Sequence, residues 1–192
     1  MANELEPAIV PRSRWRVRVG IALPLLLIAA WYGGKAVVRW HVDGLIHGKV
    51  GVALQPFRRR DRLGVEWSPA RLRGRPAVLH FFRSRCESCE REAPEYRALE
   101  QQVPASRAAI LHFATDAVLE FPAEETAATI ARKAYTRPVL IADKAFVDAF
   151  HSVAWSNVTP VTYVVDAQGN IRSALRGAQT ASGIEAALAA IE

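Results

Sequence analysis

Two cysteines at a spacing suited to thiol chemistry are the most informative residues of this sequence. Cys86 and Cys89 enclose Glu87 and Ser88, and the 192 residues contain no other cysteine. A disulfide that closes so short a loop restrains the unfolded chain little, because the stabilising effect grows with loop size. We therefore expect the pair to be chemical rather than structural, with sulfurs that are alternately oxidised and reduced.

The surroundings of the pair indicate how a thiolate would be stabilised there. Cys86 follows Ala77–Phe82, a continuous apolar run typical of a buried strand, and opens a stretch to about Val103 with apolar residues at helical spacing. The free N–H groups and positive dipole end of a helix N-terminus favour a thiolate. Cys89 lies one turn further along and can attack a mixed disulfide at Cys86. We predict that Cys86 attacks and Cys89 resolves.

Other uses of a cysteine pair fit the sequence less well. Haem attachment requires a histidine directly after the second cysteine, where this chain has Glu90. A structural zinc site requires four ligands, and neither a second cysteine pair nor a suitably spaced histidine pair is present. We expect no metal, and no cofactor beyond the redox-active disulfide of Cys86 and Cys89. An incidental pair in a loop is the simplest alternative, and the strand-then-helix context disfavours it.

The segments around the pair alternate between strand-like and helical patterns. The expected strands are Ala77–Phe82, Ala108–Thr115, Val161–Val165 and Ile171–Leu175, and the expected helices are Cys86–Val103, Glu124–Ala134, Lys144–Val153 and Ser182–Ile191. The last two strands are separated by residues 166–170, whose Gly and Asn content predicts a hairpin turn. This order predicts an α/β fold with a central mixed sheet, parallel first and antiparallel at its end, flanked by helices.

The N-terminal part has a different composition. We expect a cytoplasmic basic tail at 1–18, an uncleaved transmembrane signal anchor at 19–38, a stalk or linker at 39–62 and the folded domain at 63–192. The uncharged run from Val19 to Gly34 is slightly shorter than the roughly 20 residues that cross a bilayer, and a snorkelling Lys35 extends it. Arginines precede the span, which favours a single-pass inner-membrane protein with its domain in the periplasm. A cleaved signal peptide is the alternative.

The charge distribution bears on the class of partner. The formal net charge is +6, but the arginines cluster on either side of the expected span, where they fit anionic lipid headgroups or a solvated stalk. Those basic runs lack interleaved aromatic residues, so we expect no nucleic-acid partner. Hydrophobic residues make up 51% of the chain and charged residues 23%, which allows a packed core.

A longer pattern around the cysteines resembles the membrane-tethered, thioredoxin-like protein-disulfide reductases of the TlpA, ResA and CcmG type. It starts at Gly74-Arg75-Pro76 and continues through AVLHFFRSRCESCEREAPE, in which Glu92 and Pro94 match the family's C-x-x-C-x-x-E-x-P pattern. Pro138-Val139-Leu140 with Asp143, and Thr159-Pro160 with the following VTYVVDAQGNI, match two further segments. The similarity covers roughly residues 60–192.

The resemblance implies a thioredoxin fold in which Pro160 is a cis proline facing the cysteine pair. Thr159 would then offer backbone groups to an extended substrate segment, a form of strand addition. It also implies a thiol-disulfide oxidoreductase that reduces envelope proteins or apocytochromes, as in cytochrome c biogenesis, with electrons from a membrane thiol carrier. The direction of net flow depends on a reduction potential that sequence does not give.

The sequence departs from the family pattern beside the first cysteine. Arg85 replaces the usual aromatic residue, and its charge should favour the Cys86 thiolate while Glu87 opposes it. Ser88 replaces the proline of the ResA pattern Cys-Glu-Pro-Cys, which leaves the helix start less rigid. Two neighbouring families fit worse: a copper-delivering relative usually has three residues between its cysteines, and a peroxiredoxin has threonine where this chain has Arg83.

His80 stands six residues before Cys86, where thioredoxin has a buried acid and many tethered relatives have asparagine. It could move the proton when Cys89 acts, since the pKa of histidine lies near neutrality. Alternatively it is a core histidine bonded to the backbone. The other histidines, His41, His47, His112 and His151, belong to no visible constellation and are interpreted as structural.

Two rival functions remain open. One is a non-catalytic binding or assembly module of the cell envelope, in which Arg83 and Arg85 recruit a partner, because a fold does not guarantee chemistry. The other is an oxidase of the DsbA kind, which would need a larger helical insertion than residues 116–143 provide. Under the leading hypothesis the partners are protein thiols and disulfides.

Overall fold

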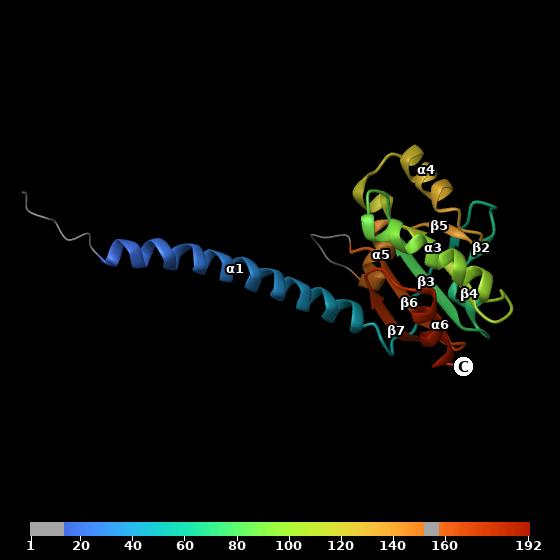
Figure 1. The fold of residues 1–192 in the computed structure, drawn as a ribbon. Helices are drawn as coiled ribbons and strands as arrows, with labels where there is room; N and C mark the ends of the chain where they lie inside the picture. The colour runs from blue at the N-terminus through green and yellow to red at the C-terminus, as the bar shows by residue number, and fades with distance from the viewer. Residues whose placement is uncertain (1–13, 152–157) are drawn as a thin grey trace, which may run out of the picture. The chain divides into compact units, whose positions relative to one another are not determined.

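The computed structural model describes residues 14–151 and 158–192, with side chains from Leu23 onward. Within it the chain divides into two compact units, the second of which is Val42–Glu192. Helix α1 (Arg14–His47) runs through the boundary between them (Figure 1). Residues 1–13 of the expected basic tail and the last two residues of the expected helix Lys144–Val153 lie outside the described residues.

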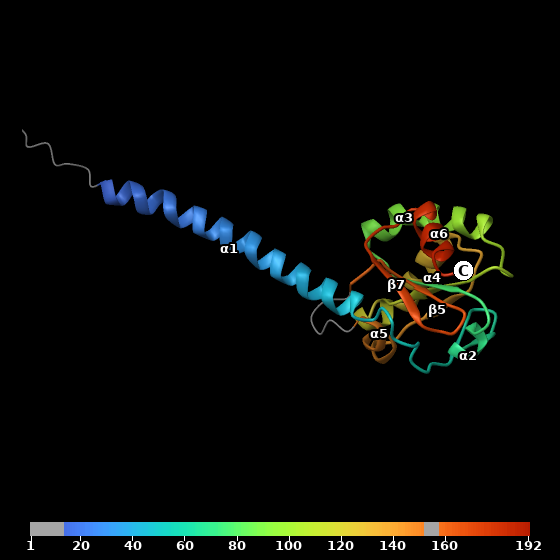
Figure 2. The same cartoon turned by 90° about the horizontal axis from the view of Figure 1, so that it is seen from below.

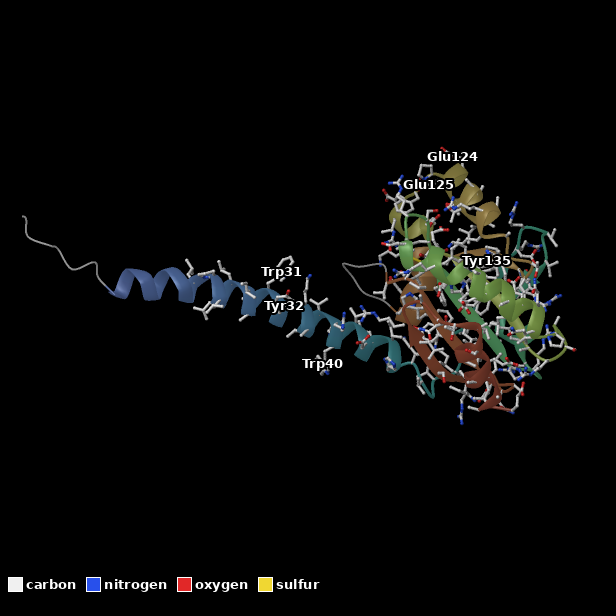
Figure 3. All side chains as sticks on the ribbon, viewed as in Figure 1. Trp31, Tyr32, Trp40, Glu124, Glu125 and Tyr135 are labelled. Carbon is white, nitrogen blue, oxygen red and sulfur yellow. A yellow bond between two sulfur atoms is a disulfide. The ribbon has the colours of Figure 1, made fainter. Side chains whose placement is uncertain are left out.

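Helix α1 contains the whole of the expected span, residues 19–38. Its exposed side chains include Trp31, Tyr32 and Trp40 (Figure 3). In the part of the chain that the structure describes, no helix combines the length and the apolar character needed to cross a bilayer. The side chains of residues 19–22, the first of the expected span, are not among those described.

A five-stranded sheet forms the centre of the second unit. The strands lie in the order β5 (Val139–Ile141), β4 (Ala109–Ala114), β3 (Ala77–Phe82), β6 (Val161–Val165) and β7 (Ile171–Arg176). The first three are parallel, and β6 and β7 are antiparallel to their neighbours. This confirms the expected mixed sheet. β5 was not expected as a strand, because three residues are too few to show a strand pattern.

Helices cover both faces of the sheet (Figure 2). α3 (Glu87–Gln102) and α6 (Ala181–Ala189) lie on one face, and α2 (Pro69–Leu72) and α5 (Lys144–His151) lie on the other. The 3-10 helix η1 (Asp116–Leu119) and α4 (Ala123–Lys133) connect β4 to β5, and a short hairpin of β1 (Arg59–Arg60) and β2 (Glu66–Trp67) precedes α2. The expected helices are thus present, and those of their ends that lie within the described residues agree to within two residues.

Successive side chains of a strand point to opposite faces of the sheet, so the position of a residue in the strand decides which helices it faces. Leu79 and Phe81 of β3 face the cluster that includes α5, whereas Val78 faces the cluster that includes α3 and α6. His80 shares the parity of Val78 and therefore points toward α3. Its register partner on β4 is His112, which points the same way. His80 and His112 therefore lie on the sheet face that is covered by α3, the helix that begins at the cysteines.

Part of the expected stalk packs on the folded domain. Four apolar residues between positions 42 and 57 are buried in the same core cluster as α5, namely Val42, Ile46, Leu54 and Phe57. In addition, Ala53 forms a β-bridge with Asn170. The packed unit therefore begins at Val42 rather than at the expected residue 63. Glycines and a basic run interrupt this segment, so its apolar residues show no regular period.

Candidate functional site

The two cysteines form a disulfide at the start of α3. Cys86 is the N-cap of that helix, and its Sγ accepts a hydrogen bond from the backbone N–H of Cys89 at 3.2 Å. The Cα atoms are 5.2 Å apart, as one helical turn allows. Cys86 is 5% exposed and Cys89 is fully buried. Cys86 is therefore the sulfur that a protein substrate can reach.

The loop that contains Pro160 lies beside Cys86, where the sequence resemblance led us to expect it. The Thr159–Pro160 peptide bond is cis. The carbonyl oxygen of Thr159 is 3.9 Å from Cys86 Sγ, and its hydroxyl donates weakly toward the same sulfur at 3.8 Å. The hydroxyl of Ser88 lies 3.5 Å from that sulfur. The accessible sulfur is thus bordered by backbone and hydroxyl groups rather than by charges.

A buried aspartate fixes the loop that leads into the disulfide. Asp116, which follows β4, accepts the backbone N–H of Ser84 at 2.7 Å and the Ser84 hydroxyl at 2.5 Å. The same hydroxyl lies 2.8 Å from that of Thr129 on α4. Arg85 then adopts a φ of 52°, which is uncommon for a residue other than glycine, and turns the chain into α3. The position of Cys86 is therefore set by contacts from two other elements.

Arg85 and Glu87 have partners that limit their effect on the sulfur. The Arg85 guanidinium makes a bidentate pair with Glu125 of α4, both bonds at 2.7 Å, and lies 4.7 Å from the centre of the Phe121 ring. Figure 3 shows Glu125 in the first turn of α4. Glu87 is exposed and pairs with Arg91 at 3.3 Å. The Glu125 carboxylate partly neutralises the Arg85 guanidinium. Arg85 therefore stabilises a Cys86 thiolate less than an unpaired arginine would.

Beneath α3, four buried side chains form one hydrogen-bonded chain. His80 Nε2 lies 2.7 Å from Glu92 Oε1, the Nδ1 atoms of His80 and His112 are 2.9 Å apart, and His112 Nε2 lies 2.7 Å from Glu100 Oε1. Their exposures run from none for the histidines to 5% for Glu100. We call this set the Glu92–Glu100 chain. The partners of His80 are side chains rather than backbone groups. The alternative that His80 is bonded to the backbone is therefore wrong.

The interpretation of His112 as a histidine without a constellation is corrected by this chain. A signal was present in the sequence: Leu-His-Phe occurs at 79–81 and again at 111–113, in the two strands expected to be neighbours. Glu92 was a candidate from its motif, whereas Glu100 was missed. The two glutamates are eight residues apart and lie on the buried face of α3. Eight residues is slightly more than two helical turns, so both side chains reach the same sheet face.

Burial sets the protonation of the chain. It lowers the pKa of His80 well below its usual value and that of His112 to about 4. Burial also raises the pKa of Glu92 to about 8, although the N–H of Gln179 and the charge of Lys133 oppose the rise. For Glu100, burial is outweighed by hydrogen bonds from His112 and Thr136, which hold its pKa below the usual value. At neutral pH both histidines are therefore neutral, Glu92 is protonated and Glu100 is ionised.

A buried lysine completes the surroundings of the resolving cysteine. Lys133, at the end of α4, donates to the carbonyl oxygen of Cys89 at 2.7 Å, and its Nζ is 3.3 Å from Glu90 Oε1. The residue is 1% exposed, and burial lowers its pKa. Sequence reasoning missed it, because a lysine in the last turn of an amphipathic helix normally faces solvent.

The described side chains include all four residue types that commonly bind metal ions. No group of three or more His, Cys, Asp or Glu residues among them is arranged to hold a metal ion. Glu92, His80, His112 and Glu100 form a line rather than a cluster, with each imidazole nitrogen directed at the next member. The outer carboxylate oxygens accept from Gln179 and Thr136.

Comparisons with known proteins agree with this geometry. The model of the AhpC/TSA family matches residues 50–174. StoA from Bacillus subtilis has a TM-score of 0.58 at 18% identity, with 69% of this chain and 96% of that chain covered. A thioredoxin-family thiol:disulfide interchange protein from Chlorobium tepidum has a TM-score of 0.62 at 18% identity, covering 72% and 94%. A secreted Mycobacterium tuberculosis disulfide oxidoreductase homologous to Escherichia coli DsbE has 0.57 at 20% identity, covering 70% and 96%.

No curated protein sequence matches the chain significantly. At these identities the solved structures establish the fold, which is the thioredoxin-like α/β fold. Cys86 and Cys89 at the start of α3 supply the chemistry that the fold presents, so site and fold together support protein-disulfide oxidoreductase activity. Since the family model spans residues 50–174, more than half of the sequence, the chain belongs to the AhpC/TSA family.

Proposed function

We propose that this protein is a thiol-disulfide oxidoreductase that reduces disulfides in other proteins through Cys86 and Cys89. The proposal rests on the different positions of the two sulfur atoms. Cys86 caps the helix and keeps 5% exposure, and Cys89 is fully buried one turn behind it and already bonded to it. This arrangement suits one sulfur to meet the substrate and the other to finish the exchange.

The exchange has two steps. The Cys86 thiolate attacks one sulfur of a substrate disulfide, which forms a mixed disulfide and releases the other substrate sulfur as a thiolate. Cys89 then attacks Cys86 Sγ; the new bond is the disulfide of this structure, and the second substrate sulfur leaves. Two electrons pass from the enzyme to the substrate, and a thiol donor must supply two electrons to restore the dithiol.

Helix α3 supports the first step. In the thiolate form, the Cys89 N–H that contacts Cys86 Sγ at 3.2 Å would donate to an anion, a stronger hydrogen bond than that to a neutral sulfur. The dipole of α3 adds to this effect at its N-terminus. The Ser88 hydroxyl at 3.5 Å is a further donor on the same side. The local backbone therefore favours the reactive form of Cys86.

We place the substrate segment along the Thr159–Pro160 loop. The Thr159 carbonyl oxygen lies 3.9 Å from Cys86 Sγ, so a chain whose cysteine meets Cys86 passes within reach of this backbone. An extended segment can pair with it as an added strand. Recognition through backbone groups tolerates many side chains, which suits an enzyme with several protein substrates.

The motif resemblance to the TlpA, ResA and CcmG type supports a finer proposal. The substrates would be envelope proteins or apocytochromes whose cysteines must be reduced, and a membrane thiol carrier would supply the electrons. The same motifs support the periplasm as the compartment. A chain whose only cysteines are the redox pair has no other thiol to be oxidised there.

We further propose that the N-terminal region tethers the domain to the membrane. Support comes from the exposed apolar side chains of α1, which include Leu25, Leu26, Leu27, Ile28 and Trp31, and from the arginines before them. In intact cells treated with a mild reductant, a membrane-impermeant maleimide should label Cys86, and the protein should remain in carbonate-washed membranes. Labelling only after the cells are permeabilised would contradict the proposed orientation.

A trapping experiment tests the central proposal. The Cys89→Ser variant should accumulate disulfide-linked partners on non-reducing gels, because Cys86 can form the mixed disulfide but nothing resolves it. Cys86→Ser is the matched control and should trap none. A binding or assembly module would give no linked partner with either variant, and the wild-type protein would not reduce insulin. Among the described residues, only η1, α4 and β5 lie between 116 and 143, which leaves no large helical insertion for a DsbA-like oxidase.

A further inference from the structure

The hairpin of β1 and β2 presents basic and apolar groups that the sulfur exchange does not use. Its tip, residues 61–65, borders a hollow of about 460 Å³ that is lined by residues 61–63, 130–131 and 134–139. We call the tip and this lining the hairpin surface. We propose that the hairpin surface binds an acidic segment of a partner protein, with an apolar side chain of that segment in the hollow. The inference goes beyond the proposed exchange, because neither cysteine belongs to this surface.

Asp61 holds the tip of the hairpin in one conformation. Its carboxylate accepts the backbone N–H of Leu63 at 2.9 Å, that of Val65 at 3.0 Å and the indole N–H of Trp67 at 2.9 Å. Gly64 has a φ of 77°, which glycine adopts without steric cost. Since these bonds already order the turn, a partner that binds the tip pays little conformational entropy to fix it.

Leu63 is the apolar part of the tip. It is 87% exposed, the largest fraction among the large apolar residues that the structure describes. A single exposed leucine needs no explanation, but Leu63 borders a hollow whose lining also includes the buried residues Ile130 and Val139. Exposed apolar groups that gather around a hollow are typical of an interaction site. An apolar side chain in the hollow would contact this lining, and the rest of the partner would cover Leu63.

The charge of the hairpin region is strongly positive. Residues 58–75 contain seven arginines and two acidic residues, Asp61 and Glu66. The turn itself occupies the carboxylate of Asp61, and Glu66 is 3.5 Å from the guanidinium of Arg58 and 3.7 Å from that of Arg60. Arg62, in the lining of the hollow, is exposed and has no hydrogen bond or ion pair with any described residue. An acidic segment would complement this charge.

Two donors in the lining of the hollow lack an acceptor. The hydroxyl of Tyr135, labelled in Figure 3, and Nε of Arg137 are buried and have no hydrogen-bond partner among the described residues. The other end of the Arg137 guanidinium donates to the carbonyl oxygens of Glu100 and Val103, which holds the side chain in place. Buried polar groups normally have partners. A carboxylate of a bound segment would bring an acceptor to this part of the hollow.

The place of the hairpin in the sheet favours a protein partner over a lipid surface. The hairpin joins the β5 edge of the sheet, where Asp61 forms a β-bridge with Leu140 (Figure 1). Residues 42–57 lead from α1 into the folded unit and join the opposite edge, where Ala53 bridges Asn170 beside β7. The chain therefore enters the folded unit at the edge away from the hairpin. This leaves the hairpin surface open to a partner other than the membrane that would hold the tether.

A defined peptide tests the proposal on the full chain in phosphatidylcholine nanodiscs. The probe is a fluorescein-labelled peptide of glutamates and aspartates around a central leucine, and fluorescence anisotropy measures its binding. Arg62→Glu should weaken binding about tenfold or more, because it replaces an attraction by a repulsion. Leu63→Ser should weaken it at least about fivefold, because it removes an apolar contact. Arg172→Glu, on β7, is the matched control: it changes the net charge equally and should bind as the wild type does.

Both substituted side chains are exposed, so the variants should keep the wild-type circular dichroism spectrum and the wild-type rate of insulin reduction. Wild-type protein that does not bind the peptide would overturn the proposal, as would an equal loss of binding in Arg172→Glu. A probe with serine in place of its leucine should bind more weakly, and equally tight binding would contradict the use of the hollow.

Nanodiscs that contain phosphatidylglycerol distinguish a protein partner from an anionic lipid. If the hairpin surface is free for a protein, the difference in peptide affinity between the wild type and Arg62→Glu should persist in these nanodiscs. The comparison of the two proteins removes the general repulsion between the lipid and the peptide. Disappearance of the difference would show that lipid occupies the hairpin surface, and it would overturn the assignment to an acidic protein segment.

Discussion

Acidification from pH 6.5 to pH 4 is expected to remove several kcal/mol from the free energy of unfolding of the oxidised protein. The cause is the set of buried neutral histidines. Burial lowers the pKa of His112 and of His151 from 6.5 to about 4, and that of His80 falls well below 6.5. Between these values the unfolded chain binds protons that the folded protein excludes, so stability is present above pH 6.5 and is lost as the pH falls. A difference of about 2.5 pKa units corresponds to about 3 kcal/mol per histidine.

Glu92 has the opposite dependence. Its folded pKa of about 8 lies above the usual 4.5, so the folded protein binds the extra proton between these values. Its contribution to stability is complete below pH 4.5 and is lost as the pH rises through 8. Below pH 6.5 the several histidines outweigh this single carboxyl. The free energy of unfolding should therefore be greatest near pH 6.5.

Urea denaturation at a series of pH values measures this dependence. His112→Asn should flatten the slope on the acid side by about one proton, because it removes one of the groups that titrate differently in the two states. His47→Asn is the control, since His47 is exposed and bonded only to the carbonyl oxygen of Asp43 among the contacts described. A free energy of unfolding that does not change between pH 6.5 and 4 would show that the buried histidines are not neutral.

Continuous apolar runs and regular periods were the parts of the fold that the sequence predicted well. Ala77–Phe82 and Val161–Val165 match the observed strands residue for residue, because strands buried on both faces consist mostly of apolar residues. The short β5 could not be predicted from three residues. The packing of residues 42–57 depends on contacts with α5 and with the turn at Asn170, which no local pattern encodes.

Site residues that belong to a local sequence motif could be predicted, whereas contacts between residues far apart in the sequence could not. The cysteine pair, Glu92 and the Thr159–Pro160 loop could be predicted because each belongs to a contiguous motif. The partner of Arg85 is 40 residues away, and Lys133 is 44 residues from the carbonyl it contacts. Such pairs depend on where α4 docks. The Glu92–Glu100 chain is intermediate, since aligning the two Leu-His-Phe segments of β3 and β4 would have paired His80 with His112.

The second large effect expected is a difference in reactivity between the two thiols of the reduced protein. Cys86 is 5% exposed, more than the fully buried Cys89, and lies at the N-cap, where the Cys89 N–H and the dipole of α3 stabilise its thiolate. Cys89 is fully buried, and burial disfavours the charged thiolate. At pH 7 we expect Cys86 to react with iodoacetamide on the order of 100-fold faster than Cys89, because only an accessible thiolate is a good nucleophile.

The most direct measurement is therefore peptide mass spectrometry of the fully reduced protein after a brief exposure to limiting iodoacetamide. Nearly all of the early modification should be on Cys86, with Cys89 modified only after unfolding in urea. Equal modification of the two cysteines in the folded protein, or earlier modification of Cys89, would contradict the assignment of Cys86 as the attacking sulfur.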